Sequence, residues 1–347
     1  MSTISKKERY LLAVRGEEVD CPPAWIMRQA GRYDPGYQAL RERYSFRDLC
    51  TIPEACAAAS ILPLRKLDVD VLIVFNDILI PLEAMGLRVE FPDSGPVIGN
   101  PPRRESDLDN FTAAQFDQPA VTACIRQLKV EAGEQVPVIG FAGAPFTLVS
   151  YAVEGKMSRN LDAIKQLMFG EPALLHEMLE RVTSTAAAYL VAQIEQGGAD
   201  GVQIFESQAS TVAPAEYEVF AAAYQRKLIA RVRAACPETP ITLYAKGSAP
   251  VLKSMAASGA DVVSIDWTHT LANAREIVGP DVTLQGNMDP GALLVPDSVE
   301  AVVRQMVEGF DWRRGFIANL GHGITPLAKV EGARNYVSAI HALGAAT

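Results

Sequence analysis

The sequence has few histidines and cysteines, and it lacks the patterns in which these residues usually bind metals. Its four histidines form no HExxH pair, and the cysteines occur without a CxxC pair, as Cys21, Cys50, Cys56, Cys124 and Cys236. The carboxylates form no evident triad, so we expect no metal site and no metal cofactor. An odd number of scattered cysteines is typical of free thiols in a reducing compartment, which predicts a cytoplasmic protein.

Long apolar runs and an excess of positive charge are also missing. The N-terminal stretch MSTISKKERYLLAVRGEE has an apolar run of only four residues, so we expect neither a signal peptide nor a membrane anchor. No other segment is long enough to span a bilayer. The 32 basic and 41 acidic residues give a net charge of −9, which argues against general affinity for nucleic acid or an anionic membrane. An anionic ligand would need a local cluster of cations.

The chain is long enough for a large core, since it has 347 residues and 49% hydrophobic content. No change of composition and no low-complexity tract divides it, so we predict one domain over residues 1–347. Short, almost continuously apolar runs predict strands that are covered on both faces, at residues 24–28, 69–75, 136–143, 199–206, 240–247, 260–266, 282–288 and 315–321.

Segments with helical periodicity lie between these runs. The clearest follows Pro172, carries an apolar stripe from Leu175 to Ile194 and is followed by Gly197 and Gly198. Other helices are predicted at residues 53–67, 120–132, 215–235, 298–310 and 330–343. Eight alternating units predict an α/β fold of the single-domain (β/α)8 TIM barrel type. An open doubly wound sheet is the alternative, although no GxGxxG follows the first strand.

One long interruption breaks this alternation. Residues 81–115 are rich in Pro, Gly, Asp and Asn. We interpret them as an excursion after the second strand, with a hairpin at residues 87–91.

Two arginines follow the first predicted strand. The apolar run that starts at Trp25 stops at Arg28, and Arg32 comes four residues later. Guanidinium groups match carboxylates in a bidentate manner and stay charged, so the pair suggests an anionic ligand. The alternative is that both arginines pair with acidic neighbours such as Asp34 on a solvated turn.

Polar residues also follow other strands, at the face where barrels carry their active sites. Asp77 would be a carboxylate that arginines keep ionised, or else a cap on the next turn. Tyr151 and Ser207 would line the pocket, or else be wall packing and a helix cap. His322 lies between two glycines, where an imidazole that titrates near neutrality could approach a ligand. A glycine-rich turn at this place also binds phosphate in many barrels.

Six motifs resemble those of the uroporphyrinogen decarboxylase family, and they occur in the order of that family over essentially the whole chain. They are MRQAGRY (27–33), FNDIL (75–79), GAPFTLVSYAVEG (143–155), QIFES (203–207), GNMDP (286–290) and NLGHG (319–323). The resemblance implies a single-domain (β/α)8 barrel, a homodimer and a cofactor-free enzyme of haem and chlorophyll biosynthesis. The implied reaction removes carbon dioxide from the four acetate side chains of uroporphyrinogen III and gives coproporphyrinogen III.

The resemblance also assigns roles to residues. It places a substrate-binding segment at Arg28, Gln29, Ala30, Gly31 and Arg32, a central aspartate that binds pyrrole N–H groups at Asp77, and further ligand contacts at Tyr151, Ser207 and His322. Arg41 matches another arginine of the family's cleft. The chain departs from the family's pattern at Asp34, Gly36, Gln38 and Asn76, which leaves open whether Asp34 draws Arg32 away from substrate.

Chemistry fits these assignments. The substrate carries eight carboxylates, which explains a need for arginines, and a protonated pyrrole ring can accept the electrons of decarboxylation without a cofactor. Asp77 would stabilise the developing positive charge. Either Arg28 or His322 could be the proton donor.

Three other functions stay open at this point. A methyltransferase of the same superfamily would use zinc, but no cysteine follows a predicted strand. A phosphosugar aldolase or isomerase could form a Schiff base at Lys246, which would leave Arg28 and Asp77 unexplained. A tetrapyrrole carrier could keep the barrel without turnover.

Overall fold

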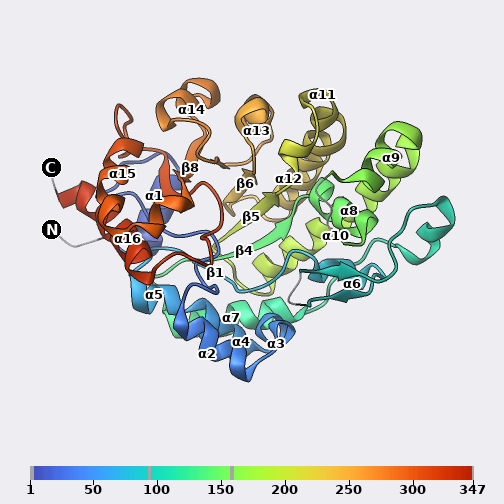
Figure 1. Ribbon diagram of the computed structural model, residues 1–347, viewed down its shortest axis with the longest axis horizontal. Coiled ribbons are helices and arrows are strands. Elements are labelled where there is room, and N and C mark those ends of the chain that lie inside the picture. The colour runs from blue at the N-terminus through green and yellow to red at the C-terminus, as the bar shows by residue number, and fades with distance from the viewer. Residues whose placement is uncertain (1–3, 93–94, 157–159, 346–347) are drawn as a thin grey trace.

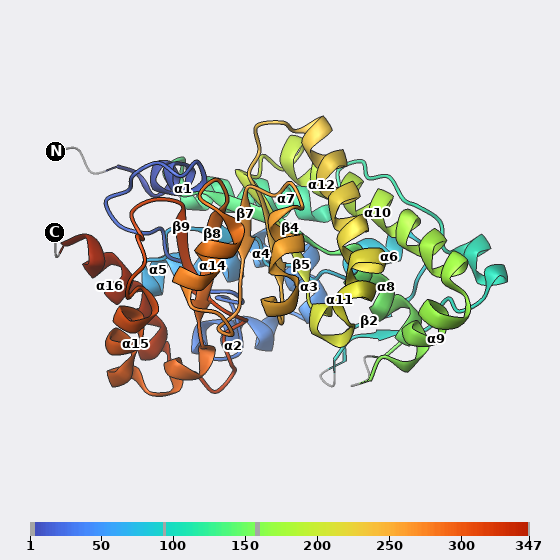
Figure 2. The same ribbon diagram turned by 90° about the horizontal axis from the view of Figure 1, so that it is seen from above.

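The computed structural model describes residues 4–92, 95–156 and 160–345. Its centre is a curled, wholly parallel sheet in the order β1-β4-β5-β6-β7-β8-β9, with helices packed around its outside (Figures 1 and 2). Its strands are β1 (Leu72–Ile73), β4 (Val138–Gly143), β5 (Gly201–Glu206), β6 (Ile241–Ala245), β7 (Val262–Ser264), β8 (Thr283–Met288) and β9 (Phe316–Leu320). The structure therefore confirms an α/β fold with a parallel sheet, and each predicted strand after the first contains one of these strands.

Helices occur where periodicity predicted them, but two of the predicted helices are interrupted. They are α1 (Lys6–Val14), α2 (Pro35–Arg43), α3 (Phe46–Thr51), α4 (Pro53–Ser60), α5 (Leu62–Leu67), α6 (Ile80–Ala84), α7 (Ala120–Ala132), α8 (Pro145–Glu154), α9 (Asp162–Gly170), α10 (Pro172–Glu195), α11 (Pro214–Tyr217), α12 (Ala223–Ala235), α13 (Leu252–Ala256), α14 (Leu271–Val278), α15 (Val299–Met306) and α16 (Val330–Ala345). Within the described ranges, none of these helices has the length and apolar character needed to cross a bilayer.

Helix α10 confirms the clearest prediction, because its apolar stripe is buried against the sheet and it ends just before the two glycines. Two predicted helices are interrupted. The helix predicted at 53–67 divides into α4 and α5, since Pro63 lacks the N–H that would continue it. The helix predicted at 215–235 contains a π-helical turn at Glu218–Ala222 between α11 and α12.

The excursion after β1 contains a hairpin, but it is longer than the one predicted at residues 87–91. Strand β2 (Val89–Glu90) lies within the predicted range and pairs antiparallel with β3 (Val97–Ile98), which lies beyond it; both are in the half of the molecule away from the two termini (Figure 2). The excursion therefore extends the wall beside the sheet without joining it.

The first predicted strand, residues 24–28, is wrong as a regular strand. Ala24 forms a single parallel bridge to Ala318 of β9. The Trp25 N–H donates to the Ala318 carbonyl at 3.1 Å, and the Asp70 N–H donates to the Ala24 carbonyl at 2.7 Å. The segment therefore lies between β9 and the residues that lead into β1, but its pairing stops after one residue.

Side-chain amides take over where that pairing stops. The Met27 N–H donates to Oδ1 of Asn319 at 2.9 Å, and the Ile26 N–H donates to Oε1 of the buried Gln29 at 3.2 Å. These bonds satisfy backbone groups that a ladder would otherwise hold. The chain can therefore turn immediately before Arg28, so that its side chain leaves the sheet.

A buried carboxylate fixes this segment to the rest of the fold. Asp70 is fully buried, and it accepts hydrogen bonds from the Ala24 N–H at 2.8 Å, Arg9 at 2.7 Å and His341 at 2.7 Å. It thereby joins α1 and α16 to the residues that precede Arg28.

We predict that Asp70→Asn lowers the free energy of unfolding by about 3 kcal/mol, because it leaves buried cationic partners without their charge. Asp68→Asn is the matched control, since Asp68 also pairs with Lys6 but its side chain is 74% exposed. We expect a change of about 0.5 kcal/mol or less for the control. Urea titrations of the variants measure both values, and equal losses would contradict the role of Asp70.

Candidate active site

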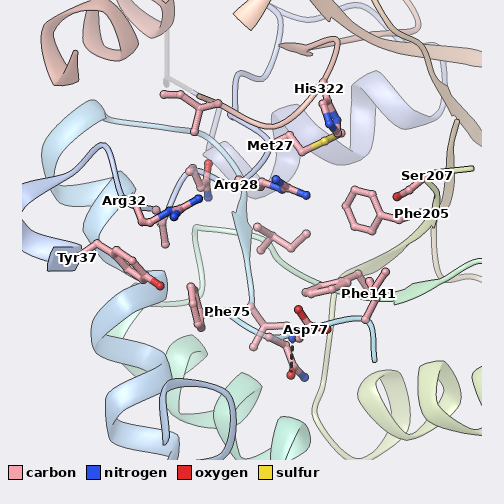
Figure 3. A pocket seen from close by; sticks show the side chains of 18 of the residues that line it. Met27, Arg28, Arg32, Tyr37, Phe75, Asp77, Phe141, Phe205, Ser207 and His322 are labelled. Atoms are coloured by element: carbon pink, nitrogen blue, oxygen red, sulfur yellow. Dashed lines mark hydrogen bonds between the residues drawn. The ribbon is translucent and has the colours of Figure 1, made fainter. Parts of the chain in front are cut away.

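A cavity of about 440 Å³ opens at the carboxyl ends of the strands. Nine residues predicted from the sequence line it, namely Arg28, Gln29, Ala30, Gly31, Arg32, Asp77, Tyr151, Ser207 and His322. They come from the ends or following loops of β1, β5 and β9, from α8 and from the segment after Trp25. Figure 3 shows Arg28 and Asp77 on different sides of this space, with Phe141 and Phe205 along a third side.

The Arg28 guanidinium extends into the cavity (Figure 3) and has no hydrogen-bond or ion-pair partner among the described residues. Its backbone has φ +63°, a conformation uncommon outside glycine. Gly323 of the turn after β9 lies directly under its side chain, and a Cβ there would collide with Cδ, Cγ and Nε of Arg28. The segment of Arg28 and the turn of His322 can therefore pack together because Gly323 has no side chain and leaves room for the Arg28 side chain.

Arg32 is likewise without a side-chain partner among the described residues, so the alternative of a pair with Asp34 is wrong. Asp34 is buried, caps α2 through the Gly36 N–H at 2.8 Å and forms an ion pair with Lys66. Gly36 makes this possible, because a Cβ at that position would collide with the Lys66 ammonium. Asp34 is thus paired with Lys66 across Gly36, and this ion pair leaves Arg32 available.

The third departure supports the same loop. The Gln38 side-chain amide donates to the Arg32 carbonyl at 2.6 Å. Within the segment, the side-chain amide of Gln29 donates to the Val71 carbonyl at 3.1 Å, and the backbone carbonyl of Gln29 accepts from the Tyr33 hydroxyl at 2.8 Å. Gln29 therefore holds the cavity wall with its side chain, whereas the arginines face the cavity.

Both interpretations of Asp77 hold. Its Oδ1 accepts from the Leu79 N–H at 2.9 Å, as in a cap, while the half-buried side chain also lines the cavity. Burial raises the pKa of this carboxyl to about 6, against the opposing effects of the Leu79 N–H and of Arg28. Arg28 favours the ionised form, in the direction expected from the sequence, but desolvation is the larger effect.

Asn76 supports Asp77 from the preceding position. Its Oδ1 accepts from the Asp77 N–H at 2.8 Å, and its amide donates to the buried Tyr189 hydroxyl at 2.7 Å. The asparagine at this fourth departure therefore has both ends occupied and fixes the turn that carries the carboxylate.

Thr147, which the sequence did not single out, joins helix α8, the helix that carries Tyr151, to the end of β5 beside Ser207. The Thr147 hydroxyl, one turn before Tyr151 on α8, donates to Oε1 of Glu206 at 2.5 Å and accepts from the Ser207 N–H at 2.8 Å. Glu206 is fully buried, and burial raises its pKa to about 7. The sequence marked Glu206 only as a carboxylate at the end of an apolar run, and it gave no signal for Thr147.

The hydroxyl of Ser207 has no role as a helix cap, because the next turn begins at Ala209 without a side-chain cap. It points towards Phe205 and the cavity in Figure 3. Burial raises the pKa of Tyr151 above its ordinary value, so this phenol is protonated at neutral pH. Both hydroxyls are therefore available as hydrogen-bond donors.

His322 does not titrate near neutrality, which corrects the expectation from sequence. Burial, together with smaller effects of the nearby Arg28 and Lys246, lowers its pKa to about 4, against an opposing effect of Asp266. Its Nδ1 lies 3.0 Å from the hydroxyl of Tyr244, a residue of β6 that also lines the cavity. At neutral pH His322 is a neutral imidazole.

Two residues weighed in the sequence analysis lie elsewhere. Arg41 is outside the cavity lining, donates to the Tyr44 carbonyl at 3.0 Å and stacks over Phe46 at 6.0 Å. Lys246 is exposed and is not a lining residue, so it lacks the desolvation that a Schiff-base lysine needs. Across residues 4–92, 95–156 and 160–345, no three His, Cys, Asp or Glu side chains gather into a group that could hold a metal ion.

The cavity walls are largely aromatic and aliphatic, and most of these residues had no individual signal in the sequence. The rings of Phe141 and Phe205 meet edge to face at 5.5 Å, and Phe75, Tyr37 and Ile78 continue the wall. Unpaired cations, one carboxylate and flat apolar walls suit a large ring that carries anionic side chains outside and N–H donors inside.

Comparisons with known proteins agree with this description. The model of the family described as uroporphyrinogen decarboxylase (URO-D) matches residues 5–343. A uroporphyrinogen decarboxylase of Trichlorobacter lovleyi is 42% identical over 338 residues, which are 96% of this chain and 98% of that protein. One of Prochlorococcus marinus is 43% identical over 334 residues, which are 95% of each chain.

A solved structure shares the fold. A methyltransferase from Methanosarcina mazei superposes with a TM-score of 0.79 over 98% of this chain and 99% of its own, at 20% identity. At this identity the likeness concerns the arrangement of strands and helices alone.

The raised pKa of Asp77 predicts that Asp77→Asn stabilises the fold at pH 7. The folded pKa of about 6 lies above the unfolded value, so the folded state binds more protons between the two, and the carboxyl's contribution falls as the pH rises through that interval. Asparagine avoids the buried charge and still accepts from the Leu79 N–H. We expect a gain on the order of 1–2 kcal/mol at pH 7 and none near about pH 3.5. Urea titrations at the two pH values measure this, and a gain of equal size at both would contradict it.

Proposed function

This chain belongs to the uroporphyrinogen decarboxylase family, and on that premise we propose that it converts uroporphyrinogen III to coproporphyrinogen III in porphyrin biosynthesis. The reaction removes carbon dioxide from four acetate side chains and leaves methyl groups. One observation carries the proposal: Arg28 and Arg32, which have no side-chain partner among the described residues, line the same cavity as the half-buried carboxylate of Asp77. Such an arrangement suits a ring that is anionic at its edge and a hydrogen-bond donor at its centre.

Substrate binding follows from the free donors of the cavity. Arg28 and Arg32 bind carboxylate side chains, because guanidinium groups without protein partners lose no ion pair on binding. Tyr151 of α8 and Ser207 of the loop after β5 donate further hydrogen bonds to the substrate. The local cations also draw a polyanion to a protein whose net charge is −9.

Catalysis requires that electrons from the breaking C–C bond have a destination. Protonation of the pyrrole carbon next to the acetate arm makes the ring cationic, and the ring then accepts the electron pair as carbon dioxide leaves, which gives an exocyclic methylene group. A second proton adds to the methylene carbon while the ring carbon loses the proton that it gained, so each decarboxylation consumes one proton and restores a pyrrole with a methyl group. Asp77 accepts the pyrrole N–H bonds and stabilises the positive charge as it develops. Because desolvated electrostatic interactions are strong, the burial that raises the pKa of Asp77 also strengthens this effect.

Arg28 is the residue that we place beside the reacting arm. An arginine is a poor acid on its own, so we propose that it orients a water molecule or a substrate carboxyl that delivers the proton. His322 contacts the substrate from the other side of Arg28.

The remaining assignments are part of the same proposal. We propose that the sheet closes into a (β/α)8 barrel through the Ala24 segment, which bonds to β9 on one side and to Asp70 before β1 on the other. The protein would be a single domain over residues 1–347, a cytoplasmic homodimer, and active without a metal or organic cofactor.

Incubation with anaerobically reduced uroporphyrinogen tests the function. We expect chromatography to show stepwise loss of four carboxyl groups by the wild type. In Asp77→Asn we expect turnover to fall by about 10²–10³, as for other preorganised electrostatic groups. Absence of decarboxylation by folded wild type, or near-normal turnover by the variant, would contradict the proposal.

Substrate affinity tests the arginines separately. We predict that Arg32→Gln raises KM by about tenfold or more, since it removes a charge-assisted hydrogen bond. Arg43→Gln, an exposed position of α2 outside the cavity lining, is the control and leaves KM unchanged within about twofold. Equal effects of the two changes would indicate general charge attraction instead of a binding residue.

A further inference from the structure

The hydroxyl of Tyr244 lies between two groups of the turn that follows β9. It is 3.1 Å from the carbonyl oxygen of Gly321 and 3.0 Å from Nδ1 of His322. Tyr244 is buried, belongs to β6 (Ile241–Ala245), and its ring is almost parallel to the imidazole, at 2°. Its place is therefore set by the central strand of the sheet.

Only one arrangement of hydrogens satisfies both contacts. A carbonyl oxygen accepts and never donates, so the single hydrogen of the phenol must point to Gly321. The phenol oxygen is then an acceptor towards His322, and Nδ1 must carry the hydrogen that is donated to it. In a neutral imidazole the other nitrogen, Nε2, has no hydrogen and presents a lone pair.

The surroundings favour the neutral forms of both residues. Arg28 and Lys246 face His322 with positive charge, Asp266 is the opposing carboxylate, and burial disfavours the imidazolium. Burial and Asp266 also raise the pKa of Tyr244 well above its ordinary value, so the phenol keeps its hydrogen. The ring that lines the cavity is thus held with one defined hydrogen pattern.

We propose that Tyr244 is a positioning residue that fixes His322 in the Nδ1–H tautomer, so that Nε2 offers the cavity a hydrogen-bond acceptor. The inference deepens the proposed function and rests on it. A bare Nε2 cannot donate to a substrate carboxylate or supply the proton that the pyrrole carbon needs. It accepts instead from a donor on the substrate, such as a protonated carboxyl, and proton delivery falls to the side of the cavity that Arg28 occupies.

Nitrogen NMR of the substrate-free protein, labelled with ¹⁵N-histidine, tests the tautomer directly. The nitrogen without hydrogen resonates far from the protonated one, and His322→Gln identifies the His322 signals among those of the four histidines. We expect Nδ1 protonated and Nε2 unprotonated at pH 7. An Nε2–H tautomer, or an imidazolium, in the wild type would overturn the proposal.

Tyr244→Phe then tests the cause. Loss of the phenol acceptor should allow a substantial Nε2–H population, and kcat/KM should fall by about tenfold, as for the loss of one hydrogen bond. Tyr336→Phe is the control, because Tyr336 is also fully buried but its hydroxyl has no hydrogen-bond partner among the described residues. It should leave the His322 signals unchanged. An unaltered His322 tautomer in folded Tyr244→Phe would remove Tyr244 from the role.

The proposed function and the His322 tautomer are tested separately. The NMR experiment contains no substrate, so its result stands whether or not the wild type decarboxylates uroporphyrinogen. If the wild type shows the Nδ1–H tautomer but has no decarboxylase activity, the proposed function fails and the tautomer stands. If Tyr244→Phe does not fold, the wild-type spectrum alone still decides between the two tautomers.

Discussion

The candidate site depends on two guanidinium groups, of Arg28 and Arg32, that no side chain of the described residues neutralises. Acidic residues outnumber basic ones in this chain, so an arginine without a carboxylate partner requires a specific arrangement. The nearest acidic candidate in the sequence, Asp34, is buried beneath the loop and paired with Lys66, which crosses Gly36 to reach it. Because Asp34 pairs with Lys66, it does not neutralise Arg28 or Arg32, and an anionic ligand can supply the negative charge that these arginines would bind.

The same arginine shows why a regular strand would not serve at the start of the sheet. A continued ladder would keep Arg28 in extended backbone, whereas its φ of +63° turns the side chain over Gly323 and into the cavity. Backbone strain of this kind persists only where its surroundings determine it. Here Asp70 fixes Ala24 before the turn, and Asn319 holds the Met27 N–H. The irregular first segment is therefore part of the construction of the site.

Sequence patterns predicted the repeated strands of the sheet but missed the contacts between residues distant in sequence. Runs such as residues 136–143 and 199–206 predicted buried strands because both faces of a parallel sheet are apolar. The run at 24–28 looks alike, but the bonds that end its pairing come from Asn319 and Gln29, and no local pattern reveals an amide distant in sequence. Placement of Asp77 at the cavity followed from its position after a strand. Its pKa did not, because desolvation outweighs Arg28 only once the whole fold surrounds it.

Under the proposed function, the raised pKa of Asp77 bears on the form of the substrate. The carboxylate must stay ionised while it leaves water, so the ligand has to replace water with several N–H donors directed at one point. A reduced porphyrinogen has four pyrrole N–H groups on a flexible ring and can turn all of them towards Asp77. An oxidised porphyrin is planar, and its two inner N–H bonds lie in the ring plane, so they cannot converge on an oxygen beside it. The aromatic walls offer apolar contact to either ring, so under this proposal it is the carboxylate of Asp77 that distinguishes between them, because only the reduced ring compensates its charge.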